Sequence, residues 1–143
     1  MKNKLLMGIT IGFGLFILTG CGDNKLNCER PMDEYMSGRG TMKGIINVGF
    51  DKDNYAEDVE VIMEANITSD EVTDEQMESI KVMLDSVCDQ NDTKYQNCDV
   101  SVNKRNVVMR ATASIKEAYK ELSDRKTKEE VKEYFEKNGF TCK

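Results

Sequence analysis

A two-residue alternation of apolar and polar side chains is the feature of this sequence that most limits its fold. The alternation runs over residues 42–50, breaks at the polar cluster 51–54, and resumes over 59–67. Successive side chains of a strand point to opposite faces, so two such runs joined by a polar turn predict an antiparallel hairpin with one face in water. Residues 100–103 and 107–115 predict a second hairpin in the same way.

Two later segments change to helical spacing, and each begins with a capping box. Thr73 precedes Gln76 by three residues, and Thr127 precedes Glu130 in the same way. Apolar stripes follow, comprising Met77, Ile80, Leu84 and Val87 in the first segment and Val131, Tyr134 and Phe135 in the second. A short helix is expected over 118–122. The order of elements predicts an α+β fold: an antiparallel sheet of about five strands, made of two hairpins and short terminal segments, with two or three helices packed on one face.

The N-terminus has the three parts of a bacterial export signal. Lys2 and Lys4 are basic, residues 5–18 are almost wholly apolar, and small residues precede Cys21. The apolar run is shorter than the roughly 20 residues that span a bilayer. The ending Leu18-Thr19-Gly20-Cys21 resembles the lipobox of bacterial lipoproteins, in which the cysteine thiol receives a diacylglyceryl group. This resemblance implies a lipoprotein signal over 1–20 and a lipidated Cys21 with a polar tether over 21–27. We expect a single α+β domain over 28–143.

Four cysteines remain once Cys21 is assigned to lipid. An even number in an exported chain indicates a disulfide framework, for which three pairings are possible. We expect Cys88–Cys98, across one loop, and Cys28–Cys142, between the first segment and the last. A zinc site and a thioredoxin-like site are disfavoured, because the chain has no CxxC motif and no histidine.

The charge balance limits the partners of the chain. The sequence holds 20 basic and 26 acidic residues, and removal of Lys2 and Lys4 would leave 18 against 26. An acidic domain disfavours nucleic acid and electrostatic docking on anionic lipid, so the diacylglyceryl group on Cys21 is expected to hold the protein on the membrane.

Candidate binding chemistry is sparse. The cluster at 51–54 begins like a calcium loop but lacks the ligands that must follow, so a hairpin turn is favoured. Seven methionines follow the signal, and thioethers bind apolar surfaces and copper(I). Most of them share faces with Val and Ile and are expected to fill the core; Met32 and Met36 lie in an irregular stretch. An acidic patch is expected to be solvated; it consists of Asp70, Glu71, Asp74, Glu75 and Glu78. No metal or cofactor site is assigned.

The chain resembles the YehR-like group of small bacterial lipoproteins, a family without an established activity. The resemblance is carried by the motif at Cys21, by the turn at 50–54, and by the closing segment 136–143, with the early Cys28 and terminal Cys142. It implies the α+β fold, an extracytoplasmic location and a Gram-positive source. It brings no catalytic residue, and Cys88 and Cys98 are outside its pattern.

The expected function is that of a non-enzymatic binding or interaction module, anchored in the cell membrane and facing the extracytoplasmic side, whose partner is an envelope protein. The absence of histidine and of nucleophile or phosphate-binding motifs disfavours catalysis. The alternatives are carriage of a small apolar ligand between sheet and helices, and a purely structural role. With 39% hydrophobic residues, the composition predicts no surplus of apolar side chains for a ligand cavity.

Overall fold

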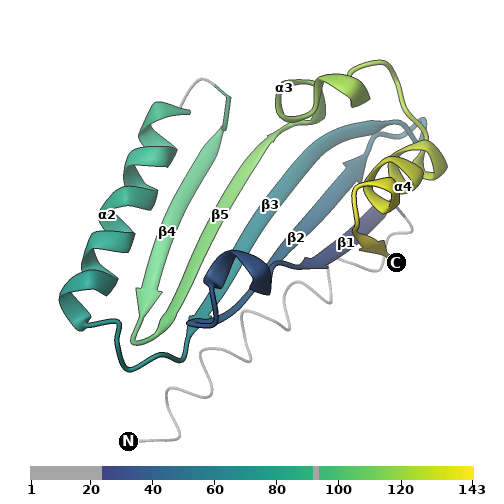
Figure 1. Ribbon diagram of the computed structural model, residues 1–143. Coiled ribbons are helices and arrows are strands. Elements are labelled where there is room, and N and C mark those ends of the chain that lie inside the picture. The colour runs from purple at the N-terminus through teal and green to yellow at the C-terminus, as the bar shows by residue number, and fades with distance from the viewer. Residues whose placement is uncertain (1–23, 92–93) are drawn as a thin grey trace, which may run out of the picture.

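The computed structural model describes residues 24–91 and 94–143, which form one antiparallel sheet with helices on one side (Figure 1). The sheet has six strands in the order β4-β5-β3-β2-β1-β6. The strands are β1 Lys25–Pro31, β2 Gly40–Phe50, β3 Ala56–Ile67, β4 Asn97–Asn103, β5 Asn106–Ser114 and β6 Thr141–Cys142. The predicted α+β fold is confirmed, with one strand more than the five or so expected.

Helical segments connect or follow the strands. They are η1 Asp33–Met36, α2 Asp74–Gln90, α3 Ile115–Ala118, η2 Lys120–Leu122 and α4 Lys128–Lys137. Both predicted capping boxes are present, with Thr73 capping α2 and Thr127 capping α4. The sequence predicted that the second hairpin continues through Ile115. In the structure the strand ends at Ser114, and Ile115 begins α3. Among the described residues, no helix has the length and apolarity needed to cross a bilayer.

The main core lies between α4 and the β1–β2–β3 part of the sheet. Val48 and Val59 are opposite each other in the β2–β3 register and both are fully buried. Val131 and Phe135 of α4 pack against them in the same cluster, at 0% and 1% exposure. Leu26 of β1 completes the layer. The apolar stripe that the sequence predicts for the last helix is therefore its core face.

An aromatic group extends this core under α3 and η2. The ring of Tyr119 meets that of Phe135 edge-on at 5.2 Å, and Tyr134 and Phe140 also contact Phe135. Burial, with a smaller contribution from Tyr134 and Tyr95, raises the pKa of Tyr119 to about 12. The phenol of Tyr119 thus stays protonated throughout the physiological range.

The chain termini meet at one edge of the sheet. Cys28 pairs with Cys142 in the β1–β6 register, and the two form a disulfide across 114 residues. A second disulfide joins Cys88 of α2 to Cys98 of β4. Both are the pairs that the sequence suggested. Strand β1 begins at Lys25, and Leu26 is 1% exposed. The predicted tether over 21–27 is therefore too long at its C-terminal end, because residues 25–27 belong to the sheet.

Candidate functional site

The helices leave the middle of their face of the sheet open. Helix α2 packs on β4 and β5, α3 lies over the ends of β5 and β3, and α4 packs on β1 and β6 (Figure 1). A groove of about 300 Å³ opens between α2, η1 and strands β2, β3 and β5. We call it the methionine groove; it is lined by Tyr35, Met36, Arg39, Met42, Met63, Ala65, Ile67, Val72, Ile80, Met83, Leu84, Val107 and Met109.

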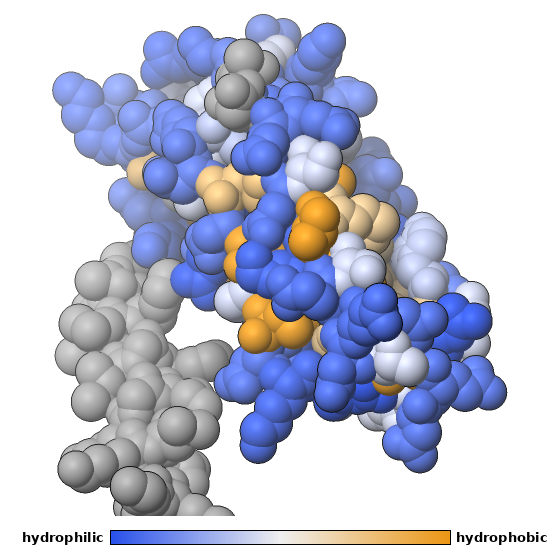
Figure 2. Space-filling view, turned by 90° about the vertical axis from the view of Figure 1, so that its left-hand side faces the viewer, coloured by the Kyte–Doolittle hydropathy of each residue, from blue (hydrophilic) through white to orange (hydrophobic). Residues whose placement is uncertain are grey.

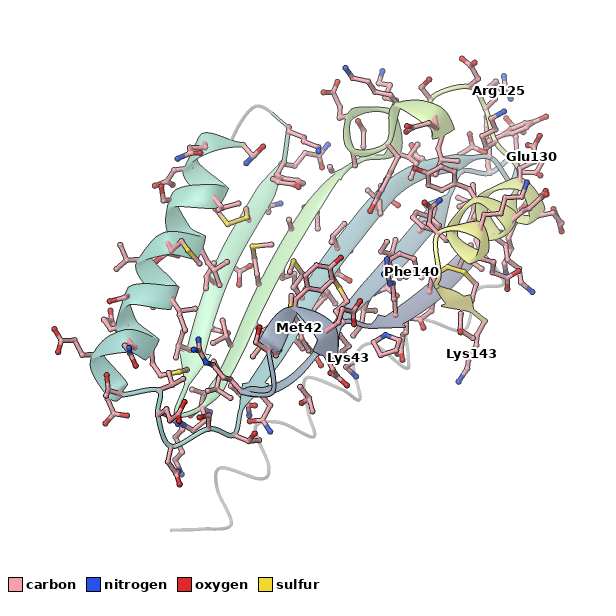
Figure 3. The ribbon with its side chains drawn as sticks, in the orientation of Figure 1. Met42, Lys43, Arg125, Glu130, Phe140 and Lys143 are labelled. Carbon is pink, nitrogen blue, oxygen red and sulfur yellow. A yellow bond between two sulfur atoms is a disulfide. The ribbon has the colours of Figure 1, made fainter. Side chains whose placement is uncertain are left out.

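Five methionines from five different elements meet in this groove. Met63 of β3 lies directly opposite Met109 of β5, and Met42 of β2 is on the next cross-strand row, opposite Ala65. Met36 enters from η1 and Met83 from α2. Figure 3 shows sulfur atoms over the strands between α2 and η1, with Met42 beside η1. These methionines form the lining of a groove, whereas the sequence led us to expect core filling for most of them. Met77 does fill the core, at 3% exposure.

The η1 wall of the groove is held to the first residues of β2. The carboxylate of Asp33 accepts a hydrogen bond from the Met42 N–H at 2.7 Å, and the Met32 N–H donates to the Met42 carbonyl at 2.7 Å. Ser37 and Gly38 both have positive φ, at 51° and 78°, which turns the chain back toward the sheet. This short helix was not predicted, because its four residues show no apolar period.

The α2 wall is held at both of its ends. At the N-terminal end, the guanidinium of Arg105 donates to the Val72 carbonyl at 2.6 Å and to the Ser69 carbonyl. These bonds join the loop before α2 to the β4–β5 turn. At the C-terminal end, the Cys88–Cys98 disulfide joins the helix to β4. Because both ends are fixed, the side of α2 that faces the groove is positioned without a large buried interface.

Apolar side chains around the groove are exposed to solvent. Of the lining residues, Tyr35 is 63% exposed and Met83 is 59% exposed. Figure 2 looks onto the side of the molecule that carries α2, where orange hydrophobic patches interrupt the hydrophilic surface. Val87, which the helical stripe predicted to be buried, is 38% exposed, because the C-terminal turn of α2 extends past the groove. Large apolar side chains exposed at the rim of an apolar groove are typical of a binding site.

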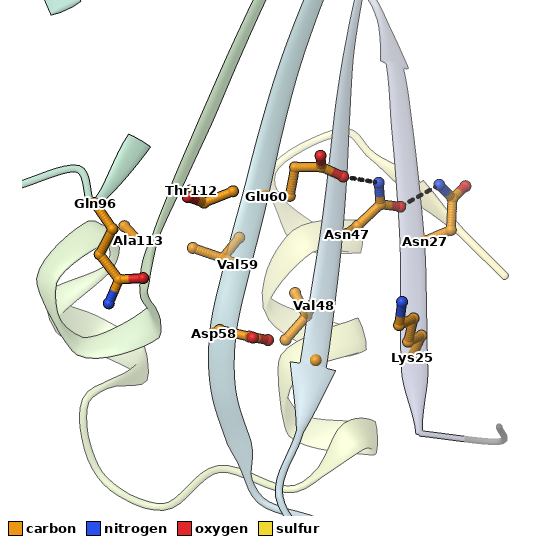
Figure 4. Close-up of a pocket in the computed structure, with 11 residues that line it drawn as sticks. Lys25, Asn27, Asn47, Val48, Asp58, Val59, Glu60, Gln96, Thr112 and Ala113 are labelled. Atoms are coloured by element: carbon orange, nitrogen blue, oxygen red, sulfur yellow. Dashed lines mark hydrogen bonds between the residues drawn. The ribbon is translucent and has the colours of Figure 1, made fainter. Parts of the chain in front are cut away.

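The opposite face of the sheet is polar and carries a shallow cleft of about 410 Å³ (Figure 4). Three of its side chains, one from each of β1, β2 and β3, are hydrogen-bonded in a row across the strands. Asn27 donates to the Asn47 side chain at 2.7 Å, and Asn47 donates to Glu60 at 3.0 Å. The guanidinium of Arg110 then lies 3.5 Å from the other oxygen of Glu60. This row satisfies its own polar groups, so we assign the binding surface to the methionine groove.

The remaining sequence candidates have simpler explanations. Asp51 accepts hydrogen bonds from the backbone N–H groups of Asp53 and Tyr55 at 2.9 and 3.0 Å, so this cluster is the β2–β3 hairpin turn that the sequence favoured. Within the described ranges, no three His, Cys, Asp or Glu side chains gather as metal ligands, the predicted acidic patch at 70–78 included. Cys21, the predicted lipidation site, lies outside the described residues.

Comparisons with protein-family models, with curated proteins and with solved structures find no match to this chain. The functional assignment therefore depends on the residues and geometry of the groove.

Proposed function

We propose that this protein is a non-enzymatic extracytoplasmic binding module that is anchored in the cell membrane through Cys21 and receives an apolar part of an envelope protein in the methionine groove. The observation that carries the proposal is the exposure of the groove: side chains as large as Tyr35 and Met83 stay more than half exposed. Exposed apolar area is unfavourable in water, by roughly 25 cal/mol for each Å², unless a partner covers it.

Methionine suits such a surface. Its unbranched thioether side chain has three rotatable bonds and adapts to differently shaped apolar partners. Four of the groove methionines are half-buried, so each keeps room to change rotamer. The sheet floor beneath them is rigid because β2, β3 and β5 are paired over their full lengths. A mobile lining on a rigid floor favours binding of a protein segment.

A photo-crosslinking residue placed at Met83 tests this function in intact cells. The matched control position is Ser101, which is also exposed but lies on the polar face of the sheet, on the β4 strand next to α2. We expect a reproducible adduct with one envelope protein from position 83 and none from position 101. No adduct from either position, or equal adducts from both, would contradict the proposal.

A small apolar ligand is the second candidate. A volume of about 300 Å³ is at the lower end of the range for small-molecule pockets, which is 300–1,000 Å³. The groove arises from the spacing of α2 and η1 over the sheet, which composition alone does not reveal. Native mass spectrometry of the purified chain distinguishes the candidates: a constant added mass that is lost in a Met83→Glu variant would favour the ligand.

Membrane attachment has its own test. In a Cys21→Ser variant, the protein should lose its acyl chains and move from the membrane fraction, or remain unprocessed at its N-terminus. Metabolic labelling with an alkyne fatty acid reads acylation directly. A Cys21→Ser chain that still incorporates label would show that the lipid is elsewhere.

A further inference from the structure

The methionine groove offers an incoming polypeptide almost no hydrogen-bond partners. Its floor strands β2, β3 and β5 are interior strands of the sheet, so their backbone groups are paired with neighbouring strands. Arg39 and Tyr35 are the only lining residues with polar side chains. A backbone that enters the groove must therefore satisfy its own N–H and C=O groups, which an α-helix does and an extended strand does not.

Arg39 is the only charged residue of the lining, and it lies at one end of the groove. Its backbone is fixed, because its carbonyl accepts hydrogen bonds from the N–H groups of Thr68 and Ser69 at 2.9 and 3.1 Å, just past the end of β3. Its side chain is exposed, and within residues 24–91 and 94–143 the guanidinium has no ion pair or hydrogen bond, although Asp70 and Glu71 follow Ser69. An unpaired guanidinium beside an apolar groove is complementary to a carboxylate.

We propose that the occupant of the groove is an amphipathic α-helix of the envelope partner, with its apolar stripe against the methionines and a carboxylate bound to Arg39. This inference rests on the proposed function and names the chemistry of the partner segment. Methionine side chains adapt to the apolar face of such a helix, and a groove of this kind takes its anchors at i, i+4 and i+7.

The dimensions of the groove fit one face of a helix. Along β3 the floor runs from Met63 to Ile67, four residue steps or about 13 Å. Anchors at i, i+4 and i+7 extend over about 10.5 Å of helix. Because α2 packs on β4 and β5 while η1 packs on β2, the walls are two to three strand spacings apart, or about 10–14 Å. A helix with its side chains is about 10–12 Å across, so its apolar side chains enter the groove while its polar face stays in water.

Titration of the full chain in lipid nanodiscs with a fluorescent helical peptide tests the inference. The probe is a hydrocarbon-stapled peptide of about 14 residues, stapled because a free helix of that length is marginal in water. It carries Leu at i, i+4 and i+7 and Glu one turn before the first Leu. One matched peptide has Gln in place of Glu, and an unstapled one has the same residues with Leu at i, i+2 and i+4.

We expect the Glu peptide to bind about three- to tenfold more tightly than the Gln peptide, and the alternating peptide not to bind. The chain has a net charge of −6, so its overall field would favour the Gln peptide, and the expected order therefore reports a local contact. Equal affinity for the Glu and Gln peptides, or binding of the alternating peptide, would overturn the proposal. Binding of decanoate in place of the helix, or a second copy of the chain crosslinked across the groove, would overturn it as well.

Charge variants locate the contact. Arg39→Gln should lower the affinity for the Glu peptide to that for the Gln peptide, and Arg39→Glu should favour a peptide with Lys at that position. Arg125→Gln is the matched control and should change neither affinity, because Arg125 is exposed and lies outside the groove, over the ring of Tyr55. Equal effects of Arg39→Gln and Arg125→Gln would contradict the contact.

The crosslink from position 83 separates this inference from the proposed function. Peptide mapping of the adduct should place the crosslink in a segment of the partner that has an apolar stripe at helical spacing and an Asp or Glu beside it. An adduct on a segment without that pattern would overturn the helix and leave the proposed function standing. No adduct from position 83 would contradict the proposed function itself.

Discussion

Removal of the disulfide between the chain termini should destabilise the domain more than removal of the disulfide that holds α2. The Cys28–Cys142 bond spans 114 residues and the Cys88–Cys98 bond spans 10. In the chain-entropy model, a loop of that first length contributes about 4.8 kcal/mol at 25 °C and the second about 2.7 kcal/mol. Cys28, Cys142 and Cys88 are buried and Cys98 is half-buried, so the burial lost on replacement by alanine differs between the pairs by only part of one small side chain. Loop length is therefore the main difference.

The assay is reversible unfolding of two double variants, Cys28→Ala with Cys142→Ala and Cys88→Ala with Cys98→Ala. For a domain of about 120 residues, the unfolding entropy near 60 °C is about 0.25 kcal/mol per degree, so we expect Tm decreases of about 19 °C and about 11 °C. Urea midpoints should follow the same order with a similar slope. Equal decreases in the two variants, or a larger decrease for the Cys88–Cys98 pair, would refute the reasoning from loop length and would indicate that anchoring α2 dominates.

Three further changes test the packing and ionisation of the domain. Thr127→Ala removes the cap of α4 and should lower the free energy of unfolding by about 1 kcal/mol in urea titrations, with Thr127→Ser as the neutral control. Gly40→Ala would place a methyl group against the backbone oxygen of Asn66 and should lower the free energy of unfolding by about 1–3 kcal/mol. In Gly49→Ala the methyl group meets only the rotatable side chain of Asp58, so the decrease should be smaller. Equal decreases would contradict this reading. Tyr119 has a pKa of about 12 in the folded state and about 10 when unfolded, so the free energy of unfolding should fall as pH rises between these values. Tyr119→Phe should flatten that fall in denaturation curves measured from pH 8 to 12.

Local patterns in the sequence predicted most of the fold because each of them is repeated over many residues. The alternation over 59–67 continues through a strand of 12 residues, and the capping boxes at Thr73 and Thr127 begin α2 and α4. Strand β1 was harder to find. Its sequence, KLNCERP, contains only Leu26 and Cys28 as inward-facing apolar residues, and its register depends on pairing with β2 and β6.

The methionine groove could not be predicted from the sequence, because it consists of apolar residues that no helix covers. Met63 and Met77 are the same residue type, and each belongs to an apolar stripe of its element. Met63 is nevertheless half-buried in the groove, whereas Met77 is 3% exposed. Which of them is covered depends on where α2 and η1 rest on the sheet. The only local signal was the irregular stretch that contains Met36, which proved to be one wall of the groove.

The early start of β1 would fix how the domain stands above a bilayer. Residues 22–24 alone separate Cys21 from Lys25, so an acylated Cys21 would hold Lys25 within about 14 Å of the anchor. Lys25 is level with Gly49, and Pro31 at the other end of β1 is level with Lys43, six residue steps or about 20 Å farther along the strand. Met42 lies beyond that row. If Cys21 is acylated and the strands stand upright on the lipid, the groove would open at the end of the sheet farthest from the headgroups, and an incoming partner would reach it without crossing the acyl chains.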